Sequence, residues 1–182
     1  RPAPGSVGDT LRFLFPYAQV PEKLFEPGSI LIAGCGTGHQ SIVEALRYPS
    51  SDIIAIDLSR ASLAYAMRRT ENLGVHNIRY LQADILDVEL LGEVFDVIEC
   101  TGVLHHMADP LAGWRALIAQ LAPGGGMKIA LYSELARRHI TEVREWIADQ
   151  NIAPGEQSIR ELRREILDLP GDDAKRNALG FT

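Results

Sequence analysis

The sequence predicts an α/β fold: a doubly wound, mainly parallel sheet with helices on both faces. Two observations predict it. Between residues 29 and 132, short apolar segments alternate with segments whose apolar residues recur at helical spacing. The apolar segments are continuous, which is typical of strands buried on both faces. Alternating strands and helices form parallel sheets, and 182 residues suffice for one domain with a sizeable core.

The first half of the chain is expected to supply two of the strands. Its elements, in order, are a helix within residues 9–20, a strand at 29–33, a helix at 39–48, a strand at 53–56 and a helix at 59–73. Pro16 and Pro21 limit the first helix, because proline has no N–H to donate inside a helix. Asp57 ends the second strand. Gly74 closes the third helix, because glycine adopts the left-handed conformation that often follows a helix.

The second half completes the expected sheet. Its elements are strands at 78–83 and 95–100, a helix at 110–121 and a fifth strand at 127–132. Asp84 follows the third strand directly. The sequence Pro-Gly-Gly-Gly at 123–126 ends the helix and is interpreted as a turn into the fifth strand. Ligands of such sheets bind outside the carboxyl ends of the strands, so residues that follow different strands are expected to converge on one crevice.

The pattern changes after residue 132. Apolar residues at helical spacing predict helices over 135–147 and around 159–166, whereas 170–182 resembles a loop or tail. We therefore expect three parts: an N-terminal helical segment over 1–28, a core over 29–133, and a helical extension or lid over 134–182.

Composition excludes several classes of protein. The net charge is −6 and no basic stripe stands out, which argues against a nucleic-acid-binding surface. No apolar run approaches the roughly 20 residues that span a bilayer, so no membrane partner is expected. The polar opening residues do not resemble a signal peptide. Because the chain lacks an initiator Met, we expect a processed or excised piece of a longer protein.

The two cysteines, Cys35 and Cys100, lack the spacing of metal ligands. They are interpreted as free thiols of a reducing compartment, which favours a cytoplasmic location. Both end strands that are neighbours in the usual order 3-2-1-4-5. No disulfide is expected even so, because it would crowd the crevice.

A glycine-rich loop follows the first strand, in the stretch LIAGCGTGHQS over residues 31–41. Gly34, Gly36 and Gly38 let a ligand approach the backbone closely, because glycine has no Cβ. The dinucleotide pattern G-x-G-x-x-G needs a third glycine where His39 stands. No Gly-Lys-Ser/Thr follows either, which excludes a Walker phosphate loop.

Two carboxylates follow neighbouring strands. Asp57 can accept hydrogen bonds from both hydroxyls of a ribose, and Asp84 can accept one from an adenine amino group. The alternatives are that Asp57 caps the next helix and that Asp84 is a turn residue. Beside the glycine loop, the pair indicates a nucleoside site.

These motifs carry a family resemblance. The stretches ILIAGCGTGHQS, IIAIDLSRASLAYA, IRYLQADILDV, FDVIECTGVLHHM and LAPGGGMKIALYS resemble class I S-adenosylmethionine-dependent methyltransferases with a Rossmann-like sheet. The sequence of these stretches is most similar to methyltransferase domains of bacterial proteins that also carry tetratricopeptide repeats, although no repeat occurs here. The resemblance implies S-adenosylmethionine as cofactor and these cofactor-binding residues: Gly34, Cys35, Gly36, Gly38, Asp57, Leu58, Asp84, Ile85 and Cys100.

The resemblance also assigns roles. Asp57 would bind the ribose, Asp84 with Ile85 the adenine, and Leu58 would pack on the adenine face. The backbone near Cys100 and Thr101 would meet the methionine part. Class I methyltransferases usually complete the sheet with two further strands. No convincing strand pair follows Tyr132, so we expect either a chain truncated before that hairpin or another element closing the edge.

The chemistry is expected to be an in-line displacement, in which the protein mainly positions the methyl acceptor, and no metal is required. His105 and His106, in the loop after the fourth strand, are the candidate catalytic residues, because a histidine can take the acceptor's proton. The alternative is that one of them only fixes the loop. Glu99 either binds an amino group or is an ordinary polar residue near a strand end.

Two other functions stay open: a nicotinamide-dependent oxidoreductase and a cofactor-binding module without catalysis. The first is disfavoured by His39 and by the absence of a Tyr-x-x-x-Lys pair. The methyl acceptor is expected to be a small molecule or a protein. A nucleic-acid base is disfavoured because Asn/Asp-Pro-Pro-Tyr/Phe is absent after the fourth strand.

Overall fold

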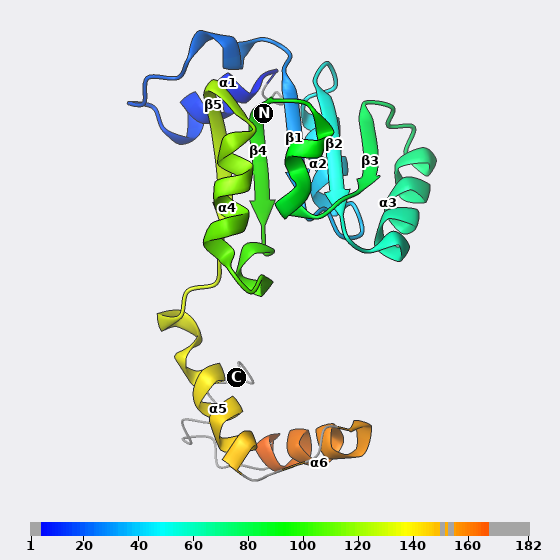
Figure 1. Cartoon of the computed structure of the whole chain (residues 1–182), viewed down its shortest axis with the longest axis vertical. Coiled ribbons are helices and arrows are strands. Elements are labelled where there is room, and N and C mark those ends of the chain that lie inside the picture. The colour runs from blue at the N-terminus through cyan, green and yellow to red at the C-terminus, as the bar shows by residue number, and fades with distance from the viewer. Residues whose placement is uncertain (1–4, 150–151, 153–154, 168–182) are drawn as a thin grey trace. The chain divides into compact units, whose positions relative to one another are not determined.

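The computed structural model describes residues 5–149, 152 and 155–167. The chain divides into two compact units, residues 1–131 and residues 132–182. The first unit contains the sheet, and the second contains helices (Figure 1).

The sheet confirms the predicted fold class. Its strands are β1 (Ser29–Ala33), β2 (Asp52–Asp57), β3 (Ile78–Gln82), β4 (Phe95–Thr101) and β5 (Leu121–Ala130). All neighbouring strands are parallel, and the order is β3-β2-β1-β4-β5, the order assumed from the sequence. The chain therefore proceeds outward in both directions from the β1–β4 pair, and a ligand crevice is expected at this point of reversal.

One face of the sheet is covered by the earlier helices. These are α1 (Val7–Leu14), the 3-10 helix η1 (Glu22–Phe25), α2 (His39–Arg47) and α3 (Arg60–Asn72). Ile30 and Ile32 of β1 point into this layer and pack there with Ala45 of α2 and Leu63 of α3. The layer is built by alternate residues of strands that are apolar throughout.

The other face is covered by α4 (Pro110–Ala119) together with the 3-10 helices η2 (Ile85–Leu91) and η3 (Leu104–His106) (Figure 1). Leu31 of β1, the neighbour of Ile30 and Ile32, belongs to this second layer with Phe95 and Leu117, all of them fully buried. Asp109 begins α4 by accepting the N–H groups of the first turn, as expected of an N-cap that precedes a proline. The sequence analysis did not foresee η1, η2 or η3.

The fifth strand differs from the expectation. It begins at Leu121, six residues before the predicted start at residue 127, and includes the segment that was interpreted as a turn. Its pairing with β4 is irregular there, because Leu121 pairs with Phe95 and Gly126 with Val97. The intervening residues bulge out of the ladder, and Gly124 takes a φ of 71°. Glycine therefore permits a bulge within the strand rather than a turn before it.

The first helix also differs. It spans Val7–Leu14 rather than residues 9–20, and Ser6 caps it by accepting the N–H of Asp9. It ends at Leu14, two residues before Pro16, because the residue that precedes a proline is disfavoured in helical conformation.

The second unit is helical, as the spacing of apolar residues predicted. It contains the 3-10 helix η4 (Leu135–Arg137), α5 (Arg138–Asp149) and α6 (Glu156–Leu167). Val143 of α5 is buried. The predicted tail over 170–182 lies outside the described residues, and the division at residues 28 and 133 stays a prediction. Within the described part of the chain, no helix is both long and apolar enough to cross a bilayer.

Candidate functional site

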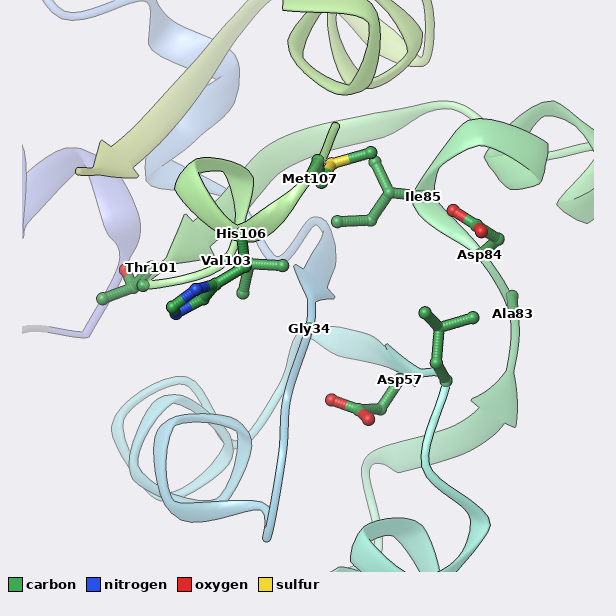
Figure 2. A pocket seen from close by; sticks show the side chains of 11 residues that line it. Gly34, Asp57, Ala83, Asp84, Ile85, Thr101, Val103, His106 and Met107 are labelled. Atoms are coloured by element: carbon green, nitrogen blue, oxygen red, sulfur yellow. The ribbon is translucent and has the colours of Figure 1, made fainter. Parts of the chain in front are cut away.

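The carboxyl ends of β1 to β4 surround a pocket of about 340 Å³, within the roughly 300–1,000 Å³ of small-ligand sites. Figure 2 shows Asp57 and Asp84 on one side of it and Thr101 and His106 on the other. The residues that line it are Gly34, Asp57, Leu58, Ala83, Asp84, Ile85, Thr101, Gly102, Val103, His106 and Met107.

Six of the eleven residues named from the sequence line this pocket: Gly34, Asp57, Leu58, Asp84, Ile85 and His106. The other five do not: Cys35, Gly36, Gly38, Cys100 and His105. The sequence analysis missed Ala83, Gly102, Val103 and Met107. The rule that ligands meet strand ends could have found Ala83, Gly102 and Val103, whereas Met107 comes close because η3 folds the chain back.

The three loop glycines differ in their surroundings, although φ is positive at all of them. A Cβ on Gly34 would collide with Val103, and a Cβ on Gly38 would lie 2.6 Å from the Cβ of Ala66. A Cβ on Gly36 would meet nothing within 4 Å. Gly34 and Gly38 are therefore required by packing inside the protein, whereas Gly36 leaves open space at the tip of the loop.

The loop is fastened to β2 by its backbone. The N–H groups of Gly34 and Cys35 both donate to the carbonyl oxygen of Ile56, at 2.8 and 2.9 Å. The N–H of Gly36 donates to Oδ2 of Asp57 at 2.8 Å. The carboxylate that follows β2 thus holds the glycine loop that follows β1.

Asp57 is oriented from two sides. Besides Oδ2 on Gly36, its Oδ1 accepts the N–H of Ser59 at 2.8 Å. Ser59 itself is the N-cap of α3, since its side chain accepts the N–H of Ser62. The N-cap of α3 is therefore Ser59 and not Asp57, so the capping alternative for Asp57 is wrong. A carboxylate oxygen can accept about two hydrogen bonds, so each oxygen of Asp57 keeps capacity for a ligand.

Leu58 and Ile85 give the pocket an apolar surface beside a second carboxylate, that of Asp84. The side chain of Leu58 is 65% exposed, and Ile85 is buried at the wall of the pocket. Oδ1 of Asp84 accepts the N–H of Leu86 at 2.9 Å and so caps η2. This turn role, the alternative considered from the sequence, leaves the pocket-lining position of Asp84 unchanged.

The cysteines are buried and free. Cys35 belongs to the core layer of α1–α3 and Cys100 to that of α4, on opposite faces of the sheet. Burial, with the nearby Asp57 carboxylate, raises the pKa of the Cys35 thiol to about 12. Burial likewise raises the pKa of Cys100 to about 11. Both are thiols at neutral pH, so neither has the thiolate character of a reactive cysteine.

Glu99 does not face the pocket. Its carboxylate is nearly buried, accepts the amide Nε2 of Gln40 at 2.9 Å and pairs with Nζ of Lys128 at 3.2 Å. The expected alternative, a carboxylate for an amino group of a ligand, does not fit this geometry. Glu99 links β4 to α2 and β5 instead.

The two candidate histidines differ in their exposure to the pocket. Their rings contact each other at an angle, with centroids 4.2 Å apart. His106 is exposed and lines the pocket, whereas His105 is partly buried and does not. His106 is therefore the histidine that a ligand in the pocket would meet.

Residues 27–168 match the model of a protein family described as methyltransferase domain. The chain belongs to this family. The pocket at the strand ends is thus the candidate site of a methyltransferase domain.

In two relatives, the segment that matches this chain is part of a longer protein. An uncharacterized protein of Synechococcus sp. is 45% identical over 120 residues, which are 65% of this chain and 29% of that protein. A ubiquinone biosynthesis O-methyltransferase of Pseudomonas fluorescens is 37% identical over 98 residues, which are 53% of this chain and 40% of the enzyme. The chain therefore spans less than half the length of either relative.

A solved structure has the same fold. PKMT2 from Rickettsia typhi aligns with a TM-score of 0.75 at 20% identity, over 94% of this chain and 35% of that one. Its complex with AdoHcy aligns with a TM-score of 0.65 at 23% identity, over 80% of this chain and 29% of that one. At this identity the likeness supports the methyltransferase fold.

Proposed function

We propose that this chain carries the cofactor site and part of the catalytic surface of an S-adenosylmethionine-dependent methyltransferase. The observation that carries the proposal is the carboxylate of Asp57, held at the pocket by the backbone of Gly36 and Ser59. Membership of the methyltransferase domain family and the AdoHcy-bound neighbour imply S-adenosylmethionine as the cofactor.

The pocket residues fit that cofactor. Asp57 offers two oriented carboxylate oxygens to the two ribose hydroxyls. Leu58 offers an exposed apolar side chain to the adenine face, with Asp84 and Ile85 beside it. The open space at Gly36 admits a ligand close to the loop backbone. On the far side, Thr101 and Gly102 would meet the methionine part.

When bound, the cofactor supplies an electrophilic methyl group on a positively charged sulfur. The contribution of the protein is then to orient the acceptor and exclude water. Val103 and Met107 give the pocket apolar walls. His106, on the same side as Thr101, is the residue that would take a proton from an acceptor hydroxyl or amine (Figure 2). His105 would support the ring of His106 from behind.

The acceptor is proposed to be a small molecule or a protein side chain. One relative is a ubiquinone biosynthesis O-methyltransferase, which favours a small molecule. The net charge of −6 disfavours a nucleic acid. Three further features stay predictions from the sequence motifs. These are a cytoplasmic location, a bacterial origin and tetratricopeptide repeats elsewhere in a longer chain. Methyl transfer to any acceptor would exclude the alternative of a cofactor-binding module without catalysis.

Isothermal titration with S-adenosylhomocysteine tests the proposal. We expect micromolar binding by the chain and at least a tenfold weaker Kd for Asp57→Ala, because hydrogen bonds to a charged group contribute about 1.5–3 kcal/mol each. The matched control is Asp52→Ala, which removes an exposed carboxylate at the opposite end of the same strand. Equal affinities of the two folded variants, or no binding by the folded parent chain, would contradict the proposal.

A further inference from the structure

The side chain of Tyr80 reaches the glycine loop from the far edge of the sheet. Tyr80 lies in β3, and its hydroxyl is 3.0 Å from Oγ of Ser41 in the first turn of α2. The same hydroxyl is 2.8 Å from Oγ1 of Thr70 in α3. Ser41 and Thr70 are both buried. One phenol oxygen thus joins three elements at a point behind the loop.

The hydrogens of these hydroxyls can be assigned. The hydroxyl of Ser41 donates to the carbonyl oxygen of Gly38 at 3.1 Å, and that of Thr70 donates to the carbonyl oxygen of Ala66 at 2.9 Å. Each has one hydrogen, so both Ser41 and Thr70 act as acceptors toward the single hydrogen of Tyr80. The phenol thus joins two side chains that are each tied to the backbone of a helix or its N-cap.

The carbonyl group that Ser41 binds belongs to the residue at which the loop becomes helix. Gly38 is the N-cap of α2, with φ of 82°. Its carbonyl also accepts the N–H of Ile42 at 3.0 Å, the first bond of the helix. A Cβ on Gly38 would lie 3.0 Å from the Tyr80 hydroxyl, so the phenol packs directly against this residue. Gly38 has no side chain with which to cap the helix itself.

The other end of the loop is fixed differently, by the bonds of Gly34 and Cys35 to Ile56. The open segment around Gly36 is therefore held between a backbone anchor on β2 and the contact of Ser41 with Gly38 and Tyr80. The N–H of Gly36 orients the carboxylate of Asp57. A displacement of the backbone at Gly38 would therefore move Gly36 and change the orientation of that carboxylate.

We propose that Tyr80 is a positioning residue for cofactor binding, acting through Ser41 and Gly38 on the glycine loop. Tyr80 does not line the pocket. Its hydroxyl fixes the conformation in which Gly36 is open and Asp57 is oriented. The effect on affinity rests on the proposed function, whereas the effect on the loop does not.

The test is Tyr80→Phe, which removes only the hydroxyl. We expect the Kd for S-adenosylhomocysteine to weaken about three- to tenfold, the worth of a typical buried hydrogen bond. Amide hydrogen exchange at Gly36 and Gly38 is expected to accelerate by a similar factor. Ser41→Ala is expected to do the same, and the double variant to show less than the product of the two effects, since both substitutions remove the same contact between Tyr80 and Ser41.

The matched control is Tyr48→Phe. Its hydroxyl contacts Oγ1 of Thr10 at 2.7 Å, at the opposite end of α2, so a tyrosine–threonine contact is lost without touching the loop. We expect unchanged affinity and unchanged exchange at Gly36 and Gly38.

Equal effects of the two Tyr→Phe variants, or loop exchange in Tyr80→Phe equal to that of the parent chain, would overturn the inference. Absence of S-adenosylhomocysteine binding by the parent chain would overturn the proposed function instead, and the exchange rates at Gly38 would still decide the role of Tyr80.

Discussion

At the scale of single residues, the three glycines of the loop have different surroundings in the structure. Gly34, Gly36 and Gly38 all adopt positive φ, which an L side chain disfavours by about 1–2 kcal/mol. Of these three, only Gly34 and Gly38 have another side chain of the protein in the space that a Cβ would need. The regular spacing that identified the loop therefore does not show that the middle glycine borders open space while the other two pack against side chains.

This difference predicts unequal effects of alanine. Gly36→Ala is expected to lower the free energy of unfolding by about 1–2 kcal/mol through backbone strain alone. Gly34→Ala is expected to cost about 1–3 kcal/mol more, because Val103 must also move. Urea unfolding measures both. Gly36→Ala is nevertheless expected to weaken S-adenosylhomocysteine binding at least tenfold, since its methyl group occupies the open space. Equal losses of stability in the two variants would contradict this account.

At the scale of elements, Glu44 of α2 and Glu99 of β4 bring two buried carboxylates close together. The amide of Gln40 donates to Glu44 at 2.8 Å and to Glu99 at 2.9 Å. Arg47 pairs with Glu44, and Lys128 of β5 pairs with Glu99. Burial raises the pKa of Glu44, and the Glu99 carboxylate raises it further, while Arg47 and Lys128 oppose the shift. The network therefore joins three elements, and the pKa of Glu44 is higher in the folded chain than in the unfolded chain.

Linkage gives the sign of the pH dependence. A carboxyl whose pKa is higher in the folded than in the unfolded chain takes up a proton on folding, so stability is lost as pH rises from its ordinary value of 4.5 through the raised value. Glu44→Gln removes the charge and keeps one acceptor oxygen. Its stability relative to the parent chain is therefore expected to increase as pH rises above the ordinary pKa of 4.5.

Urea unfolding at several pH values measures this difference. The control is Glu71→Gln, an exposed glutamate of α3, for which no comparable trend is expected. A relative stability of Glu44→Gln that falls as pH rises would show that the charged form of Glu44 is favoured in the folded protein, against the expectation.

At the scale of the whole molecule, the pocket belongs to one unit. All of its lining residues lie between Gly34 and Met107, within the unit that ends at Leu131. The four strands that contribute them meet around the β1–β4 reversal point.

A chain shortened to residues 1–131 is therefore expected to bind S-adenosylhomocysteine within about threefold of the full chain, which corresponds to less than about 1 kcal/mol. Titration calorimetry measures it. Val143→Asp in the full chain is a second variant, because it places a charge at a buried position of α5. Loss of binding in both variants would show that the helical unit takes part in the cofactor site.

The sequence by itself determined the order of elements, the parallel sheet and the convergence of Gly34, Asp57 and Asp84, because these follow from local periodicity and from the rule for strand ends. The tertiary structure decided the bulge in β5, the packing of Cys35 and Cys100 on opposite faces, and the withdrawal of Glu99 toward Gln40. It also decided which histidine lines the pocket and that Tyr80 reaches Gly38. These features depend on contacts between side chains far apart in the sequence, which no local pattern encodes.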